Sequence, residues 1–343
     1  MSAPLLAVRD LCVHFPMRVG GLRRGRLLTL KAVDGVSFDL EAGETLGLVG
    51  ESGCGKSTLG RAVLQLISPT SGRVAWQGED ITGLSAEAMR PKRRAMQIVF
   101  QDPLAALNPR MTVGEIVAEP LRAHQPELGT DAIQRRAQAM LEQVGLSAQM
   151  RNRYPHEFSG GQCQRIGIAR AMILAPKLIV CDEPVSALDV SIQAQIVNLL
   201  VGLQREFGLA LLFISHDLAV VRHISRRVMV LYLGKIMEIA DRDAIYAHPR
   251  HPYTQALIAA APIPDPDVEQ AKRPIALQGE PPSPLAPPSG CVFRTRCPKA
   301  TALCAAATPP LEYDADGHHA VACHHWRDDE SRQGLTGATL TPS

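Results

Sequence analysis

The sequence predicts an α/β protein whose parallel sheet is buried, followed by an irregular carboxy-terminal segment. Strand-like and helix-like patterns alternate through the first 240 of the 343 residues, which is the order of elements in α/β folds. Two of the strand-like runs, 178–181 and 209–214, are short and nearly all apolar, as strands covered on both faces are. Twelve of the 26 prolines then lie between Pro262 and Pro310, which excludes regular helix or central strand there.

The first elements lead to a glycine-rich loop. Residues 5–49 contain short β-like runs, which a basic, glycine-rich stretch from Arg18 to Lys31 interrupts. We expect this stretch to be a solvated surface loop, with attraction to anionic lipid headgroups as the alternative. A compact apolar strand at 45–49 runs into the glycine-rich loop, and apolar residues at helical spacing over 59–67 predict a helix behind it.

The later elements are helical first and β-like afterwards. Residues 103–177 carry an apolar stripe at helical spacing, so we expect this part to be mostly helical. Two short β-like runs, 228–232 and 235–240, flank Gly234 in the pattern of a hairpin.

Charge and hydropathy exclude several classes of protein. The chain has 36 Lys and Arg against 34 Asp and Glu, a net charge of +2, which is too balanced for a protein that binds nucleic acid through bulk charge. No apolar run approaches the roughly 18–20 residues needed to span a bilayer, and the amino terminus lacks the pattern of a signal peptide. The sequence therefore predicts a cytosolic protein that acts on any membrane from outside it.

The glycine-rich loop matches the pattern G-x-x-x-x-G-K-[ST] between a strand and a helix. Its residues, all candidates for nucleotide binding, are Gly50, Glu51, Ser52, Gly53, Cys54, Gly55, Lys56, Ser57 and Thr58. Glycines allow backbone N–H groups to surround a phosphate chain, and the helix amino terminus adds partial positive charge. Lys56 can reach the β- and γ-phosphates, and the Ser57 hydroxyl can bind Mg²⁺. The alternative is an ordinary glycine turn before a helix.

Two carboxylates follow the apolar strand at 178–181. Asp182 directly follows the strand and comes 126 residues after Lys56. We expect it at the sheet edge beside the loop, where it can hold Mg²⁺ directly or through water. Glu183 comes next and is placed to orient or deprotonate an attacking water. The alternative is a pair of solvated carboxylates at a strand end.

A second small-residue turn opens another helix, expected from Arg165 to Leu174. The run Phe158-Ser159-Gly160-Gly161-Gln162 resembles the LSGGQ signature of the ATP-binding subunits of ABC transporters, with Phe in place of Leu. The resemblance covers about residues 5–240. It implies a P-loop NTPase with a RecA-like core, an antiparallel β subdomain and a helical subdomain. It also implies that ATP is sandwiched between two such domains, each facing the other's loop.

The resemblance assigns further site residues, whose motifs follow one another along the chain in the same order as in the family. Gln101 matches the Q-loop and would join Ser57 and Asp182 around Mg²⁺. Asp189 matches the D-loop, and His216 matches the switch histidine that contacts the γ-phosphate, so Glu183 and His216 are the candidate catalytic residues. Phe15 is the candidate for stacking on adenine, with a buried strand aromatic as the alternative reading.

The length of the ATP-binding domain, or cassette, and two short segments indicate which branch of the family the chain resembles. Only 109 residues separate Gly50 from Ser159, which leaves no room for the long coiled coil of the DNA-repair and chromosome-condensation members. The translation members carry two cassettes, and exporters commonly carry membrane helices. The segments Asn108-Pro109-Arg110 and His251-Pro252-Tyr253 resemble those of the oligopeptide/dipeptide importers, specifically the second of their two ATP-binding subunits, the F-type subunit. The alternative reading of the His-Pro-Tyr segment is a loop that covers the sheet edge.

This resemblance implies domains, partners and location. It predicts an ATP-binding domain at 5–240, with its helical subdomain at about 103–177, and a carboxy-terminal extension at 241–343. The partners would be a paralogous ATPase, two membrane permease subunits and, indirectly, a periplasmic or extracellular peptide-binding protein, with no nucleic acid. The chain would lie peripherally on the cytoplasmic face of the cell membrane. Nickel chelates, glutathione and peptide-like antibiotics remain alternative substrates, and a soluble regulatory ATPase is the alternative from another class.

Four of the eight cysteines fall within one stretch of 33 residues, 291–323, which overlaps the end of the proline-rich segment. They are Cys291, Cys297, Cys304 and Cys323. In a reducing cytosol such a group indicates a metal site more than disulfides. The pairs typical of zinc sites are absent, and in dipeptide-importer ATPases the same pattern resembles a [4Fe–4S] site. Zinc, with neighbouring histidines His318, His319, His324 and His325 as further ligands, and free thiols or disulfides remain the alternatives. We expect the group to be a structural clip.

Overall fold

The computed structural model describes residues 3–19, 26–261 and 279–327. Residues 20–25 of the expected basic loop, residues 262–278 of the proline-rich segment and the last sixteen residues lie outside the described residues. Within the described ranges, no helix has the length and apolarity that a bilayer crossing requires.

The central sheet has eight strands in the order β11-β12-β10-β9-β3-β8-β7-β6. They are β3 (Thr45–Val49), β6 (Met96–Val99), β7 (Leu178–Asp182), β8 (Ala210–Ile214), β9 (Arg227–Tyr232), β10 (Lys235–Asp241), β11 (Glu312–Tyr313) and β12 (Ala320–Val321). From β6 to β9 every neighbouring pair is parallel, and from β9 to β11 every pair is antiparallel. The buried strands and the β9–β10 hairpin predicted from the sequence are confirmed.

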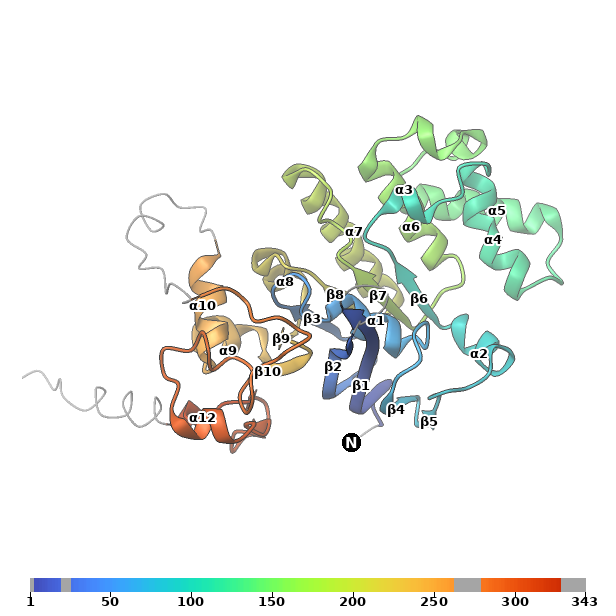
Figure 1. Cartoon of the computed structure of the whole chain (residues 1–343). Coiled ribbons are helices and arrows are strands. Elements are labelled where there is room, and N and C mark those ends of the chain that lie inside the picture. The colour runs from blue at the N-terminus through green and yellow to red at the C-terminus, as the bar shows by residue number, and fades with distance from the viewer. Residues whose placement is uncertain (1–2, 20–25, 262–278, 328–343) are drawn as a thin grey trace, which may run out of the picture.

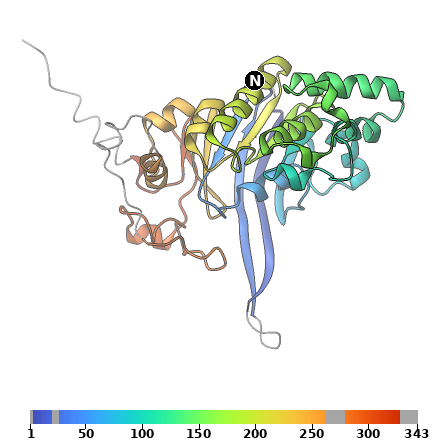
Figure 2. The ribbon, with the colours of Figure 1, turned by 90° about the horizontal axis from the view of Figure 1, so that it is seen from above.

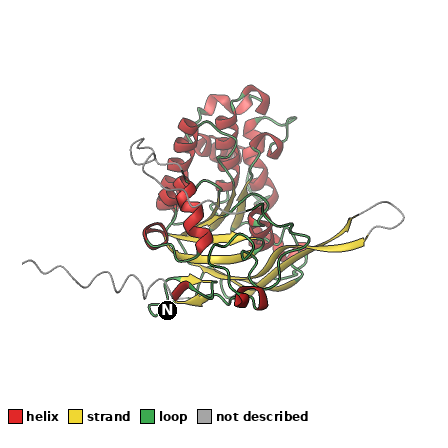
Figure 3. Ribbon diagram, turned by 60° about the vertical axis from the view of Figure 1, so that its left-hand side comes forward, coloured by secondary structure: helices red, strands yellow, loops and turns green. Residues whose placement is uncertain are grey.

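A second, antiparallel sheet has the order β2-β1-β4-β5. Its strands are β1 (Leu6–Val19), β2 (Arg26–Leu40), β4 (Ser71–Trp76) and β5 (Glu79–Asp80). The expectation of a basic surface loop from Arg18 to Lys31 is wrong at both ends, because Arg18 pairs with Leu27 and Val19 with Arg26. The two strands continue as a long hairpin whose far end projects from the body of the molecule (Figures 2 and 3). Backbone pairing with β1 supports this arm although its side chains are largely exposed.

The helices are grouped by position along the chain. They are α1 (Lys56–Val63), α2 (Ala86–Arg93), α3 (Pro103–Ala106), α4 (Val113–His124), α5 (Thr130–Gln143), α6 (Gly160–Met172), α7 (Val190–Phe207), α8 (Leu218–Ile224), α9 (Arg242–Ala247), α10 (Pro252–Ala260) and α12 (Ala302–Ala306), with short 3-10 turns at Ala148–Asn152 and Pro155–Glu157. Figure 1 places α3 to α6 at one end of the molecule and α9, α10 and α12 at the other. The mostly helical character predicted for 103–177 is confirmed.

One helix begins earlier than expected. The sequence predicted a start at Arg165, but α6 begins at Gly160, directly after Ser159. The Ser159 hydroxyl accepts the N–H of Gln162, and the Gln162 side chain accepts the N–H of Ser159. This reciprocal capping satisfies backbone groups that a helix start otherwise leaves unpaired, so the small-residue turn is itself the first turn of the helix.

The two faces of the central sheet belong to two apolar cores. Leu178 and Val180 of β7 pack into the core shared with the second sheet and α1, whereas Ile179 and Cys181 face the core shared with the helices. This alternation is what a strand covered on both faces produces. The carboxy-terminal extension also enters the helical core through Phe293, and its β12 pairs with β10. The sequence alone suggested an extended appendage, but the extension is packed onto the rest of the chain.

Candidate nucleotide-binding site

The glycine-rich loop connects β3 to α1, as expected. Gly55 precedes α1 with a φ of +106°, and a Cβ there would lie 2.0 Å from the Ala32 carbonyl oxygen. Any side chain at this position would therefore collide with backbone, in a conformation that L-residues avoid. Within the described chain no side chain caps α1, so its first N–H groups are available to an anion.

Lys56 lies at the centre of the loop. Its ammonium donates to the carbonyl oxygens of Gly50, at 2.8 Å, and Glu51, at 3.0 Å, and it lies 3.9 Å from Glu183 Oε1. The side chain is only 4% exposed. A buried ammonium held by neutral carbonyls and one carboxylate retains strong attraction for a further anion, because burial weakens the screening of its charge. The Cys54 thiol lies 3.9 Å from the same ammonium, and burial raises the pKa of this thiol.

An oxygen pair that suits a divalent cation forms between α1 and β7. The Ser57 hydroxyl donates to Asp182 Oδ1 at 2.6 Å, and Arg61 pairs with the other carboxylate oxygen at 3.2 Å. Asp182 is 1% exposed at the end of β7. Carboxylate and hydroxyl oxygens are ligands that Mg²⁺ prefers, so this pair can hold the metal beside the loop.

Glu183 is surrounded by three of the other candidate residues. Gln101 donates to its Oε2 at 3.1 Å, and His216 Nδ1 lies 3.4 Å from the same oxygen. Together with Lys56, these contacts place the side chain at the mouth of the loop. Glu183 also has a φ of +48°, a strained conformation for a residue with a side chain. Such strain persists where the surrounding structure imposes it and concentrates at functional sites. The sequence carried no signal of it.

A cavity of about 280 Å³ joins these elements. Its lining comprises Phe15, Leu30, Lys31, Ala32, Gln101, Glu183, Leu233, Gly234, Pro284 and residues 52–58 of the loop. Phe15 thus lies where an aromatic side chain could cover a base. Leu233 and Pro284 are lining residues that the sequence analysis missed, because nothing in their local pattern marks them. Glu51 was a candidate nucleotide contact, but it does not line the cavity.

The signature turn and the D-loop residue lie outside this cavity. Ser159 and Gly160 are exposed, and so is Asp189 at the start of α7. None of residues 159–162 is among the lining residues. Within the described part of one chain, the two small-residue turns therefore do not form one binding site.

The four clustered cysteines lie near one another in the extension. The charge of Cys304 contributes to raising the pKa of Cys291, Cys297 and Cys323. Burial raises the pKa of Cys291 and Cys297 and raises the pKa of Cys323 to about 11. All eight cysteines are described and none forms a disulfide.

Hydrogen-bond donors lie beside two of these sulfurs. The His325 N–H donates to Cys323 Sγ at 3.4 Å. The Thr301 hydroxyl lies 3.6 Å from Cys304 Sγ. Such bonds stabilise thiolates and tune the potential of iron–sulfur clusters. Burial nevertheless raises the pKa of Cys323, so the hydrogen bond only partly offsets the effect of burial.

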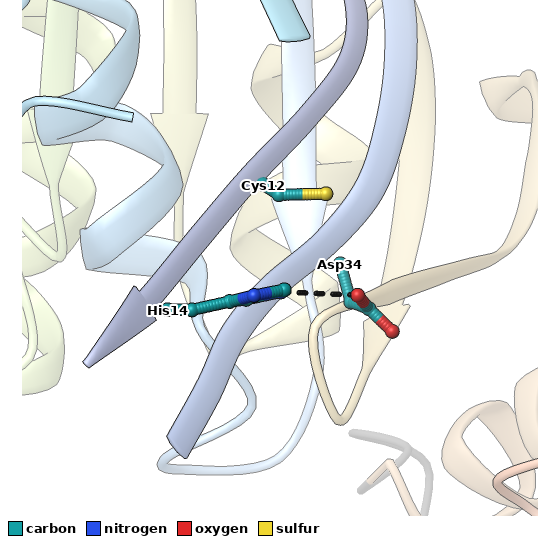
Figure 4. Close-up of side chains that lie close together, drawn as sticks. All are labelled: Cys12, His14 and Asp34. Carbon is teal, nitrogen blue, oxygen red and sulfur yellow. Dashed lines mark hydrogen bonds and ion pairs between the residues drawn. The ribbon is translucent and has the colours of Figure 1, made fainter. Parts of the chain in front are cut away.

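A different cluster contains three metal-ligand types, Cys12, His14 and Asp34, whose ligand atoms lie within 4.8 Å of one another. Figure 4 shows His14 directed at Asp34, with Nε2 and Oδ1 separated by 3.1 Å. Asp34 also pairs with Lys235 at 3.0 Å and Lys31 at 3.5 Å, and its pKa is lowered overall by these cations and His14, against the effect of burial. Two ammonium groups beside the carboxylate oppose a metal ion, so this cluster is an ion-pair network between the β1–β2 hairpin and Lys235 of β10.

Comparison with known proteins agrees with this geometry. The ABC transporter family model matches residues 33–186, and the model described as oligopeptide/dipeptide transporter, C-terminal region, matches residues 237–304. The chain is 60% identical over 320 residues to the oligopeptide transport ATP-binding protein OppF of Salmonella typhimurium, with 93% of this chain and 95% of that protein aligned. This chain belongs to the ABC transporter family. As a member of its oligopeptide/dipeptide branch, it is an ATPase subunit that energises peptide import.

Other relatives extend the likeness. OppF of Escherichia coli is 58% identical, with 93% and 95% of the two chains aligned, and the putative oligopeptide transport ATP-binding protein YkfD of Bacillus subtilis is 52% identical, with 96% and 98% aligned. Among solved structures, the post-hydrolysis dimer of the ATP-binding cassette MJ0796 bound to ADP and Pi has a TM-score of 0.61 and 28% identity, covering 69% of this chain and 98% of that chain. The ABC-type P-loop fold expected from the sequence is confirmed.

Proposed function

We propose that this ABC transporter subunit binds ATP and Mg²⁺ in the cavity between Phe15 and the glycine-rich loop. Lys56 and the first N–H groups of α1 receive the phosphates, and Ser57, Asp182 and Gln101 hold the metal. The observation that carries this assignment is the meeting of Lys56, Gln101 and His216 around Glu183. These residues come from four separate parts of the sequence, which a chance grouping of polar side chains does not explain.

Glu183 is the residue we assign to the activation of water, and His216 is assigned to the γ-phosphate. A carboxylate at 15% exposure can accept a proton from water while Gln101 and His216 fix its orientation. The Glu183→Gln variant keeps the size and hydrogen-bonding capacity of the side chain but removes its basicity. We expect it to bind ATP normally in the full transporter and to lose hydrolysis by at least about a hundredfold, the range of a general base. Unchanged hydrolysis would overturn the assignment.

The exposed signature turn supports a sandwich of two cassettes. We propose that Ser159, Gly160, Gly161, Gln162 and Asp189 contact ATP held by a partner's loop, because they lie outside this chain's own cavity. The partner is a paralogous ATPase, and the pair docks on two permease subunits at the cytoplasmic face of the membrane, supplied with peptide by a binding protein. Co-purification with permease subunits tests this assembly, whereas a soluble regulatory ATPase would be recovered without them.

We also propose two functional regions, an ATP-binding domain at 5–240, with its helical subdomain at about 103–177, and an extension at 241–343. The boundary falls at the end of β10, although β12 of the extension adds to the same sheet. The extension then packs against the ATP-binding domain and is stabilised by its own cysteine group.

For that cysteine group we propose a [4Fe–4S] cluster held by Cys291, Cys297, Cys304 and Cys323. Tetrahedral zinc with bonds of about 2.3 Å places sulfurs about 3.8 Å apart. Among the residues that the structure describes, no three of these sulfurs lie within 4.8 Å of one another. A four-iron cluster holds its thiolates further apart, since each binds a different iron. Anaerobically purified protein should be brown, whereas colourless protein with one equivalent of zinc would exclude the cluster.

A further inference from the structure

Glu51 lies in the glycine-rich loop but is directed away from the nucleotide cavity. Its backbone N–H donates to the Tyr253 hydroxyl at 3.0 Å. Its two carboxylate oxygens accept from Arg296 Nη1 at 2.9 and 2.8 Å. Both partners belong to the carboxy-terminal extension, so the loop is held from outside by residues about 200 and 245 positions away.

These partners are themselves firmly packed. Tyr253 is fully buried, and its ring lies 4.7 Å from the ring of Tyr232 and 5.3 Å from that of Phe293. The Arg296 side chain is 8% exposed, and its guanidinium lies 5.9 Å from the Tyr232 ring centre. Burial of an arginine is favourable only with a matched anion. Glu51 supplies that anion, which fixes the position of both side chains.

Glu51 also contacts Lys56, the residue that would bind phosphate. The Glu51 carbonyl oxygen accepts from the Lys56 ammonium at 3.0 Å. One residue therefore has its N–H bound by Tyr253, its carboxylate by Arg296 and its carbonyl by Lys56. A change in the position of Glu51 moves one of the two carbonyls that orient Lys56.

Arg296 is placed by the cysteine segment. It immediately precedes Cys297, and its N–H donates to the Phe293 carbonyl at 3.0 Å within the turn that begins at Cys291. The Cys291 N–H donates to the Cys304 carbonyl at 2.8 Å. The backbone that carries two of the cysteines thus also aims Arg296 at the loop.

We propose that Arg296 and Tyr253 are positioning residues for ATP binding, which hold the glycine-rich loop through Glu51 and make its geometry depend on an intact cysteine segment. The inference rests on the proposed nucleotide site. It gives the carboxy-terminal extension a role in the ATPase reaction beyond structural support.

The experiment measures binding of a fluorescent ATP analogue to the purified full-length chain with Mg²⁺. Arg296→Ala and Tyr253→Phe are each expected to weaken binding by about five- to tenfold, within the usual range of coupling between linked sites. Tyr253→Phe is the sharper variant, because it removes only the hydroxyl and keeps the ring between Tyr232 and Phe293. Arg294→Ala is the matched control, since Arg294 lies in the same segment but donates to Ser289.

A double-mutant cycle separates positioning from general destabilisation. Arg296→Ala added to Glu51→Ala should weaken binding little further than Glu51→Ala alone, because both remove one interaction. Adding Arg294→Ala to Glu51→Ala should leave binding at the level of Glu51→Ala. Additive losses for Arg296 and Glu51 would overturn the proposed route through Glu51.

The cysteine segment is tested in the same assay. Cys297→Ser should weaken binding in the presence of Arg296 and have little further effect in an Arg296→Ala background. Lys56→Ala reports on the underlying site. If Lys56→Ala leaves binding unchanged, the proposed nucleotide site itself is wrong. If Lys56→Ala abolishes binding while Arg296→Ala, Tyr253→Phe and Cys297→Ser do not alter it, only the positioning role is overturned.

Discussion

The Ser57 hydroxyl donates a hydrogen bond of 2.6 Å to the carboxylate of Asp182. These residues are 125 positions apart in the sequence, one at the start of α1 and the other at the end of β7. Because β3, β8 and β7 are parallel neighbours, their carboxyl ends meet at one edge of the sheet, where the glycine-rich loop also lies. The parallel topology thus brings a phosphate-binding loop and a metal-binding carboxylate together.

The first prediction concerns the metal. Asp182→Asn keeps the shape of the side chain and removes its charge, so Mg²⁺ should no longer strengthen ATP binding. We expect the Mg²⁺-dependent gain in affinity to fall by at least about tenfold, because a carboxylate is a much stronger ligand than an amide for this ion. Titrations with and without Mg²⁺ measure the gain. Glu87→Gln removes an exposed carboxylate from α2 and should leave it intact; an undiminished gain in Asp182→Asn would contradict the assignment.

The second prediction separates two causes of glycine requirement in the loop. Gly53 and Gly55 both have positive φ, but a Cβ at Gly53 meets nothing within 4 Å. Gly53→Ala should therefore lower the free energy of unfolding by about 1–2 kcal/mol, the strain of the left-handed conformation alone. Gly55→Ala adds a collision with the Ala32 carbonyl and should lower it further and abolish ATP binding. Denaturant unfolding checks this order.

A control for this pair is Gly129→Ala, at a position with ordinary φ and open space around its Cβ. It should change stability little. Equal destabilisation by Gly53→Ala and Gly55→Ala would show that the close approach of Ala32 does not constrain the loop.

The sequence was informative where function depends on local pattern. The glycine-rich loop, the buried strand that ends at Asp182 and the hairpin around Gly234 each follow from a few consecutive residues. The arm of the β1–β2 hairpin was misread because its charged residues, such as Arg18, are exposed. Backbone pairing makes this segment a strand. Because few of its side chains are buried, the sequence lacks the apolar alternation that marks a strand packed on a core.

Long-range contacts could not be predicted in the same way. The pairing of Arg296 with Glu51 joins residues 245 positions apart, and neither has a pattern that points to the other. Phe293 lies in a proline-rich stretch that resembles exposed chain, yet it is fully buried. The positive φ of Glu183 is likewise imposed by its surroundings and has no signature in the local sequence.

The third prediction distinguishes the chain's own site from the shared one. Ser159 lies outside the cavity, so Ser159→Ala should leave ATP binding by the isolated chain unchanged. In the assembled transporter the same variant should lower the rate of ATP hydrolysis, because the turn contacts nucleotide held by the partner. Loss of the Ser159 cap should also reduce stability by about 0.5–2 kcal/mol. Weaker ATP binding by the isolated chain would contradict a role across the interface.

The final prediction concerns acid stability and His251, at the start of α10. The side chain is 1% exposed, and burial lowers the pKa of His251 to about 4, with Glu238 opposing the shift. The unfolded chain binds this proton near its ordinary pKa of about 6.5. The contribution of a neutral His251 is therefore complete above pH 6.5 and is lost as the pH falls towards 4.

The variant His251→Asn tests this contribution. In the wild type, His251 Nδ1 accepts the N–H of Tyr253 at 3.0 Å, and asparagine can replace that cap without titrating. We expect the free energy of unfolding to fall between pH 7 and pH 4 by about 3 kcal/mol less in the variant than in the wild type, from a shift of about 2.5 pKa units. Urea unfolding at a series of pH values measures how the free energy of unfolding changes with pH in the wild type and in the variant. Because the two proteins differ only at position 251, an equal dependence on pH would exclude His251 as a source of acid sensitivity.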